Sequence, residues 1–337
     1  MKLKKNFFKN KSILVTGASG SIGSAIVKSL LKKSCKVIRA LTNDENGLYD
    51  LNNEIDNFYE DDLLKNMKKK KVRFLLGDVR DFNRCLKSSK KVDIVIHVAA
   101  LKHVPICEYN PEEAFSTNVL GTKNMINASI KNKIKFFLFI STDKVINPTS
   151  QMGKTKLMAE NLVLNKNSKK IKTKFSVIRF GNVIGSRGSV LLRFVEQIKN
   201  EKCLTVTDPK MTRFFITIKK AVDAIFGAIT LMQGNEIFII KNMKAFKILD
   251  LANVLKKIMH SSHKIIYSGS RKGEKFYEEL ATKKEMKSVN TVKDFFIIKK
   301  VKDDTSQAIE IKNSHLTEHL NKKEISFFIK KNFNFKI

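Results

Sequence analysis

The sequence predicts an α/β protein in which a doubly wound parallel sheet is followed by a smaller C-terminal domain. Short apolar runs of strand length alternate with helical patterns through the first half of the chain, and repeated β-α-β units of this kind imply a parallel sheet. A glycine-rich turn joins the first strand to the first helix. After about residue 185 the elements become shorter and less regular, which indicates the second domain.

Each expected element of the first half has its own signal. Residues 12–16 form an apolar run that ends in glycines, and residues 22–32 carry apolar side chains at helical spacing. Residues 36–41 and 72–76 are typical of the second and third strands. Residues 92–99 are apolar almost throughout, as expected of a parallel strand that is covered on both faces.

A helix is expected to begin after the fourth strand, with Asn110 as its N-cap and Pro111 in its first turn. Residues 136–141 form the fifth predicted strand, residues 151–164 the next helix and residues 175–180 the sixth strand. These segments complete the second half of the predicted sheet.

The less regular part has fewer predicted elements. We expect helices near residues 191–200, 248–259 and 323–331, and a strand near residues 236–240. The predicted domains are residues 1–184 and residues 185–337, with the strand near 236–240 returning to the first domain.

The composition limits the partners of the chain. The net charge is +33, but the lysines are spread along the whole sequence, and arginine, which usually reads phosphates and bases, is scarce. We therefore attribute the charge to compositional bias and expect no nucleic-acid partner. No apolar run approaches the roughly 20 residues that span a bilayer, so we expect a cytoplasmic chain without a membrane span. The four cysteines are scattered, which predicts neither a disulfide framework nor a metal site.

The turn at residues 16–23, Thr-Gly-Ala-Ser-Gly-Ser-Ile-Gly, follows a strand and opens a helix. Gly17 permits the tight turn, Gly20 lets the backbone approach a pyrophosphate, and Gly23 lets the helix pack close to the sheet. The helix N-terminus supplies N–H groups and the positive end of its dipole. The motif predicts a bound nicotinamide dinucleotide, with contacts from Gly17, Ser19, Gly20, Ser21, Ile22 and Gly23.

Further cofactor contacts are expected where the next strands end. Asp44 is the candidate to read the adenosine ribose, after a small shift of the turn that follows the second strand. Asp78, beside Val79, is placed to accept a hydrogen bond from the adenine amino group, unless it is a simple turn residue. Ala99 and Ala100 follow the fourth strand. The choice between NAD and NADP stays open, and the lack of an arginine beside Asp44 in the sequence slightly favours NAD.

The catalytic candidates follow the fifth strand. Thr142, Asp143 and Lys144 stand at its end, and the next helix carries Met152 and Lys156 at a spacing that puts both on one face. A short-chain dehydrogenase has Tyr-x-x-x-Lys here, so Lys156 would hold the nicotinamide ribose while Met152 replaces the tyrosine. Methionine cannot transfer a proton, which excludes the ordinary tyrosine-based oxidation of an alcohol.

A sugar-nucleotide 4,6-dehydratase would use the charged pair. Such an enzyme oxidises C4, removes the proton on C5, protonates the departing C6 hydroxyl and returns the stored hydride to C6. We expect Lys144 to be the C5 base, with a lowered pKa, and Asp143 to be the acid, with a raised one. Thr142 would take the O4 proton, with or without a water between them. Two alternatives stay open. A UDP-sugar 4-epimerase would not need Asp143 and Lys144. A non-catalytic regulator that senses the dinucleotide would explain why methionine stands at position 152.

Several segments together resemble one family. They are residues 99–105, 141–144, 147–149, 152–156, 179–190, 208–214 and 273–275. From about residue 11 to about residue 280 the chain resembles the UDP-N-acetylglucosamine 4,6-dehydratases of bacterial polysaccharide biosynthesis, which are extended short-chain dehydrogenases/reductases. Methionine at the tyrosine position resembles the larger, membrane-anchored members. Residues 101–111 instead resemble the short, soluble, C5-inverting members.

The resemblance implies a Rossmann-type fold, UDP-N-acetylglucosamine as substrate, a tightly bound and recycled dinucleotide, and a homo-oligomer. The implied product is a UDP-4-keto-6-deoxy-hexosamine for surface polysaccharide or nonulosonic acid synthesis. The implied substrate contacts are Lys102, His103, Asn182, Ser189, Val190, Arg213, Arg271 and Glu274. The alternatives are surface ion pairs for the two arginines and a structural role for the histidine. Asn118 is expected to make a backbone hydrogen bond that shapes the site.

Overall fold

The computed structural model describes residues 6–57, 71–166, 170–271, 273–299 and 309–333. Within these residues nine strands form one sheet, in the order β13-β14-β10-β6-β5-β4-β1-β2-β3. The strands are β1 (Ser12–Thr16), β2 (Val37–Thr42), β3 (Val72–Leu76), β4 (Ile94–His97), β5 (Phe136–Ile140), β6 (Lys174–Arg179), β10 (Glu236–Ile240), β13 (Val289–Val292) and β14 (Phe295–Lys299). In this spatial order, all neighbours between β10 and β3 pair in parallel. At the other end of the sheet, β14 and β13 add an antiparallel edge. The predicted α/β fold class is confirmed.

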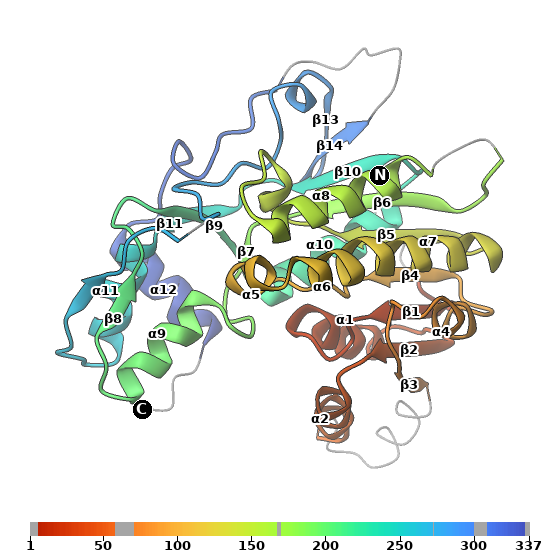
Figure 1. The fold of residues 1–337 in the computed structure, drawn as a ribbon, viewed down its shortest axis with the longest axis horizontal. Coiled ribbons are helices and arrows are strands. Elements are labelled where there is room, and N and C mark those ends of the chain that lie inside the picture. Colours follow the sequence, from red (N-terminus) through yellow and green to blue (C-terminus); the bar gives the residue numbers. More distant parts are fainter. Residues whose placement is uncertain (1–5, 58–70, 167–169, 272, 300–308, 334–337) are drawn as a thin grey trace.

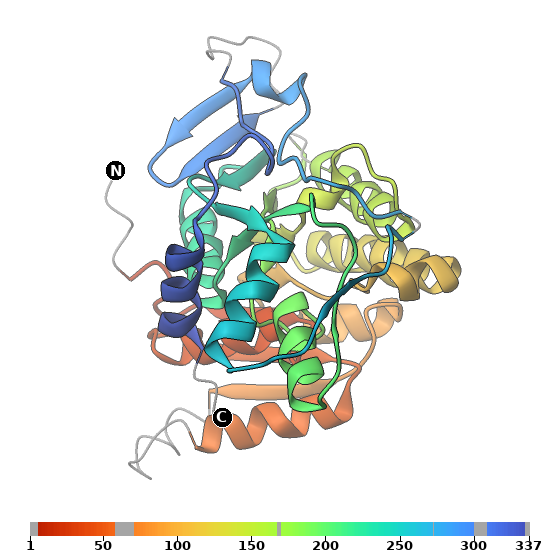
Figure 2. The same ribbon diagram turned by 90° about the vertical axis from the view of Figure 1, so that its left-hand side faces the viewer.

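Helices cover both faces of this sheet (Figures 1 and 2). They are α1 (Ser21–Leu31), α2 (Glu45–Asp56), α4 (Phe82–Ser88), α5 (Val104–Tyr109), α6 (Pro111–Phe115), α7 (Gly121–Lys131), α8 (Gln151–Leu164) and α10 (Ile218–Leu231), with a π-helical turn η1 (Ser116–Leu120) between α6 and α7. In one layer α1 packs against α10, and in the other α7 packs against α4 and α8. None of the helices in the described ranges is both long enough and apolar enough to cross a bilayer.

A second lobe lies beside the large sheet, on the left in Figure 1. It contains β7 (Asn182–Val183), β8 (Leu204–Val206), β9 (Thr212–Ile216), β11 (Lys244–Lys247), β12 (Ile265–Tyr267), α9 (Val190–Lys199), α11 (Ile248–Ile258) and α12 (Lys322–Asn332). This lobe has its own apolar core, in which the rings of Phe215 and Phe246 stack with their centroids 4.1 Å apart. The chain crosses between the two parts more than once, because β10 and β14 return to the large sheet before α12 joins the second lobe. The predicted domain boundary at residue 184 stays a prediction.

Two expected local structures differ from the observed ones. Asn110 stands at the start of α6, but its side chain donates to Ile106 O (3.0 Å) in the preceding helix and does not cap α6. The strand expected over residues 92–99 is limited to β4, because the N–H groups of Val98 and Ala99 donate to Thr16 Oγ1 (3.1 and 3.2 Å) instead of to a neighbouring strand. The chain therefore leaves the sheet early at this edge.

A buried ion cluster joins three distant segments. The guanidinium of Arg179, at the end of β6, forms an ion pair with Glu160 on α8 and with Glu285 in the short 3-10 helix η3 (Glu285–Lys287; 2.8 Å). Ser141 also donates to Glu160 (2.7 Å). The cluster ties the helix after β5 to the C-terminal part of the chain.

Candidate active site

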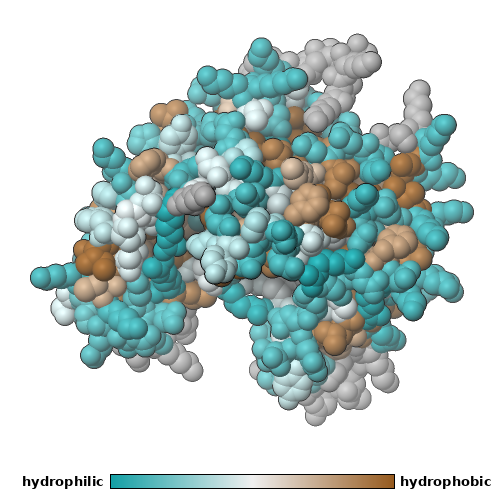
Figure 3. Space-filling view, in the orientation of Figure 1, coloured by the Kyte–Doolittle hydropathy of each residue, from teal (hydrophilic) through white to brown (hydrophobic). Residues whose placement is uncertain are grey.

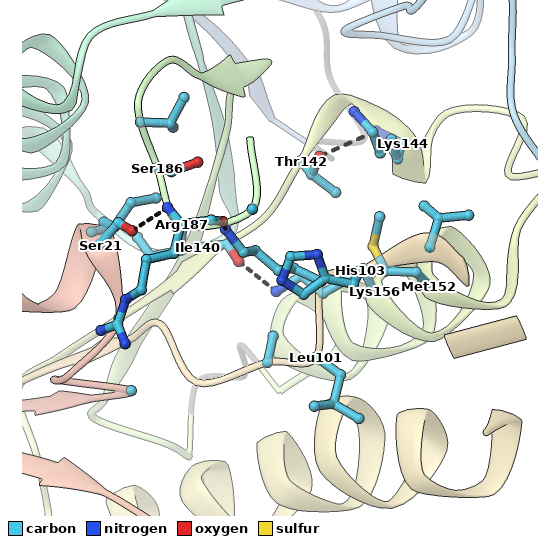
Figure 4. A pocket seen from close by; sticks show the side chains of 18 of the residues that line it. Ser21, Leu101, His103, Ile140, Thr142, Lys144, Met152, Lys156, Ser186 and Arg187 are labelled. Carbon is cyan, nitrogen blue, oxygen red and sulfur yellow. Dashed lines mark hydrogen bonds between the residues drawn. The ribbon is translucent and has the colours of Figure 1, made fainter. Parts of the chain in front are cut away.

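A cavity of about 990 Å³ opens where the parallel strands end, between the large sheet and the second lobe. Ligands bind at this edge of doubly wound sheets, and the volume suits a dinucleotide with a second ligand. Every site residue predicted from the sequence lines this cavity except Gly23 and Asp143, which are buried behind it. Figure 4 shows the central part of the cavity, and Figure 3 shows that the surrounding face is mostly hydrophilic, with separate hydrophobic patches.

The glycine turn has a geometry that suits a dinucleotide. Gly17 has a φ of +62°, and a Cβ there would lie 2.8 Å from Ala99 Cα. A Cβ at Gly23 would overlap Gly17 O, so this glycine is needed for α1 to pack against the turn. At Gly20 the only described neighbour of such a Cβ within 4 Å is Gly17 O (3.3 Å), and the remaining space belongs to the cavity. Backbone N–H groups at the start of α1 can thus approach a diphosphate closely.

The two predicted nucleoside contacts already have protein partners. Asp44 caps α2, a helix that the sequence analysis missed: its Oδ1 accepts from Gly47 N–H (2.9 Å) and its Oδ2 from Ser19 Oγ (3.1 Å). Burial alone would raise the pKa of Asp78, but hydrogen bonds from Arg80 outweigh burial and lower it. Asp78 therefore stays a charged acceptor at the cavity wall, beside Arg80.

Three side chains form a hydrogen-bonded cluster after β5, in the 3-10 helix η2 (Asp143–Val145) and the residue before it. Asp143 Oδ1 accepts from Thr142 Oγ1 (2.8 Å) and from Lys144 Nζ (2.9 Å), while Asp143 Oδ2 is buried with no hydrogen-bond partner among the described residues. Thr142 and Lys144 line the cavity, and Asp143 lies behind them. Any proton that Asp143 exchanges with a ligand therefore has to pass through Thr142 or Lys144.

The expected lowered pKa of Lys144 is wrong for this structure. Burial alone would lower the pKa, but the carboxylates of Asp143 and Glu278 outweigh burial and raise it. Glu278 Oε1 lies 3.4 Å from Lys144 Nζ and 3.7 Å from Arg213 Nε. Glu278 could not be identified from the sequence, because no local pattern connects it with the end of β5.

Met152 and Lys156 both face the cavity from α8, one turn apart (Figure 4). Lys156 Nζ donates to Ile140 O (2.6 Å) and lies 4.0 Å from the centre of the Phe139 ring. Burial lowers the pKa of Lys156 to about 7. An uncharged amine is therefore accessible near neutral pH at the place where the tyrosine is missing.

Most of the predicted substrate contacts come from the second lobe and the segments beside it. Asn182 accepts a hydrogen bond from Lys144 Nζ (2.9 Å). Arg213 is buried, so the alternative of a surface ion pair is wrong, and its guanidinium donates to Lys275 O (2.7 Å). Arg271 lies exposed at the cavity beside Glu274. The hydroxyl of Ser189 is buried without a hydrogen-bond partner among the described residues, and Ser189 and Val190 line the cavity.

The loop after β4 completes the cavity wall. Lys102 Nζ donates to Arg187 O (2.6 Å), and the His103 ring packs against Gly188. Burial and the neighbouring Lys102 lower the pKa of His103. The backbone hydrogen bond expected of Asn118 is confirmed: Asn118 Oδ1 accepts from Leu101 N–H (2.8 Å).

Comparison with known proteins agrees with this geometry. The model of a family described as polysaccharide biosynthesis protein matches residues 13–300. The chain is 42% identical to "Uncharacterized membrane protein MJ1061" of Methanocaldococcus jannaschii, over 96% of this chain and 97% of that one. It is 36% identical to a "UDP-glucose 4-epimerase" of Rickettsia bellii, over 94% and 95% of the two chains. The X-ray structure of Pen from Bacillus thuringiensis is similar with a TM-score of 0.90 and 36% identity, over 98% of this chain and all of that one. Solved structures of the same fold, at lower identity, contain NAD.

Proposed function

The chain belongs to the polysaccharide biosynthesis protein family of extended short-chain dehydrogenases/reductases, and from that premise we propose that it is a UDP-N-acetylglucosamine 4,6-dehydratase that inverts C5. The observation that carries the proposal is the hydrogen-bonded cluster of Thr142, Asp143 and Lys144 beside Lys156. The proposed product is a UDP-4-keto-6-deoxy-hexosamine. The protein would act as a homo-oligomer.

The glycine turn and Lys156 would hold the dinucleotide, with a slight preference for NAD. When bound, the dinucleotide would accept one hydride from the sugar and later return it. The residues of the cluster would handle the proton transfers of the reaction. The O4 proton would pass through Thr142 to Asp143, along the hydrogen bond of 2.8 Å. Asp143 would return that proton, again through Thr142, to the departing C6 hydroxyl, which leaves as water. Lys144 would take the proton from C5, and C5 would be protonated again after elimination.

Lys144 can act as a base only after it has lost its own proton. Protonation of Asp143 removes one of the two carboxylates that raise the pKa of Lys144, so the first step favours the second. Because Glu278 remains beside Lys144, we expect the elimination step to become faster as the pH rises from about 7 to about 9.

The test is a proton NMR time course with UDP-N-acetylglucosamine in deuterated buffer. We expect a new 6-deoxy methyl signal, a 4-keto product and deuterium at C5. A parallel run in ordinary water keeps the C5 proton, and its nuclear Overhauser contacts with the other ring protons report inversion. Lys144→Ala should lower the rate by about a hundredfold or more while dinucleotide binding is kept. Lys154→Ala, at an exposed position on α8, is the matched control and should leave the rate unchanged. Full activity of the Lys144 variant would contradict the assigned role.

A UDP-sugar 4-epimerase is the second candidate, and the Rickettsia relative named UDP-glucose 4-epimerase favours it. In the same experiment this activity would produce UDP-N-acetylgalactosamine, without a 6-deoxy methyl signal and without deuterium at C5. No reaction with any UDP-sugar, with either NAD or NADP present, would instead favour a dinucleotide-sensing regulator, for which Met152 is the supporting residue.

A further inference from the structure

One residue of the second lobe reaches back to the dinucleotide half of the cavity. Arg187 lies in the loop between β7 and α9, and its N–H donates to Ser21 Oγ (2.9 Å; Figure 4). Its carbonyl oxygen accepts from Lys102 Nζ (2.6 Å). Its guanidinium lies 3.8 Å from Asp44 Oδ2. No arginine stands beside Asp44 in the sequence, because Arg187 follows far along the chain.

The three contacts of Arg187 span adjacent strands. Ser21 follows β1, Lys102 follows β4 and Asp44 follows β2, and these strands are neighbours in the order β4-β1-β2. A dinucleotide that extends along this edge, from Asp44 towards Lys156, would have to pass beneath Arg187. The charge also fits, since the backbone of Arg187 is bonded to Ser21, the first residue of α1, and its guanidinium adds a cation to a site for a diphosphate.

We propose that Arg187 is a cofactor-retaining residue, which closes over the diphosphate of the bound nicotinamide dinucleotide. Release of the dinucleotide then requires the loop that carries Arg187 to leave Ser21 and Asp44. The proposal rests on the dinucleotide binding assumed in the proposed function, but on neither of its sugar-nucleotide reactions. In both reactions the hydride returns to the sugar, so the dinucleotide need not leave between turnovers, and slow release would be an advantage.

The experiment measures how fast NADH leaves the loaded protein without any sugar nucleotide. The protein is loaded with NADH and mixed with excess NAD, and the decay of NADH fluorescence gives the dissociation rate. In Arg187→Ala we expect this rate to rise by about tenfold or more, because a charge-assisted contact to a phosphate is lost. Lys199→Ala is the control. It removes one positive charge at an exposed position of α9, outside the cavity, and should change the dissociation rate of NADH by less than about twofold.

Asp44→Asn provides a second variant that keeps the cap of α2, since asparagine is also a good N-cap. It removes the charge that faces the guanidinium, so it should accelerate release more in the wild-type background than in the Arg187→Ala background, where only the contact of Asp44 with the ribose is changed. An unchanged release rate in Arg187→Ala would overturn the proposal. So would faster release of NADPH alone, which would make Arg187 a reader of the 2′-phosphate. Because no sugar nucleotide is present, failure of the dehydratase proposal would leave these rates unaffected.

Discussion

The charge of Lys156 depends strongly on its surroundings. Burial lowers the pKa of its amine, while Glu160, one turn further along α8, acts in the opposite direction. Arg179 forms an ion pair with Glu160. This pairing limits how much Glu160 can favour the charged form of Lys156, so the uncharged form becomes accessible near neutral pH.

The stability of the fold should report this pKa. In the unfolded chain a lysine has a pKa of about 10.4, so between about pH 7 and 10 the unfolded state holds a proton that the folded state has lost. The contribution of Lys156 to the free energy of unfolding therefore becomes more favourable as the pH rises, by at most about 1.4 kcal/mol per pH unit. Urea unfolding at several pH values should show the wild type gaining stability relative to Lys156→Met. A constant difference would show that Lys156 keeps its charge.

At this scale the sequence identified most of the cavity residues but not their electrostatics. Thr142, Lys144 and Lys156 could be found because each has a fixed place after a strand or on a helix. The pKa of Lys144 was predicted in the wrong direction, because the carboxylates of Asp143 and Glu278 together outweigh burial, and Glu278 approaches from a distant part of the chain. Such contacts depend on tertiary packing, which no local pattern encodes.

At the scale of elements, two glycines near the start of α1 have different roles: Gly20 faces the cavity, and Gly23 packs against the turn. Gly20→Ala places a methyl group in the cavity on backbone that is already extended, so the free energy of unfolding should change by less than about 1 kcal/mol. Binding of NADH should nevertheless weaken by about tenfold or more, because the backbone can no longer approach the diphosphate. Thermal unfolding and an NADH titration measure the two effects.

Gly23→Ala is the companion variant. Its methyl group would overlap Gly17 O, so it should destabilise the fold by about 1–3 kcal/mol or more and also weaken NADH binding. If the two variants lost stability equally, the distinction between an open and a packed glycine would be incorrect.

Elements with a strong local pattern were predicted with accurate bounds. The strands β1, β3 and β10 and the helix α8 match the expected ranges, since apolar runs and periodic spacing define them. Helix α2 was missed because its sequence is mostly polar and its cap, Asp44, had been interpreted as part of a turn. The antiparallel strands β13 and β14 were also missed. β14 pairs with β10, which precedes it by some fifty residues, and β13 joins the sheet through β14.

At the scale of the whole molecule, the cluster of Arg179, Glu160 and Glu285 should make stability sensitive to acid. Burial alone would raise the pKa of Glu285, but hydrogen bonds and charge from Arg179 outweigh burial and lower it. The stabilising contribution is therefore complete above about pH 4.3, the unfolded value, and is lost as the pH falls through the lower folded pKa. Glu285→Gln should cost about 1–3 kcal/mol at pH 7, and the cost should shrink below about pH 4.

Urea unfolding as a function of pH measures this effect. Glu310→Gln, at an exposed position, is the control and should match the wild type within about 0.5 kcal/mol. A loss for Glu285→Gln that did not change with pH would show that packing, and not charge, holds this segment in place.

The return of β10 to the large sheet also has a consequence for synthesis on the ribosome. β6 emerges with an apolar, unpaired edge, and the partner that covers this edge is not made until the chain has grown from Arg179 to Glu236. At about 5–20 residues per second this interval lasts several seconds. During that time an open strand edge can pair with another nascent chain. The surplus of lysines makes neighbouring chains repel each other, so the unusual charge of this protein would protect it while it is still incomplete.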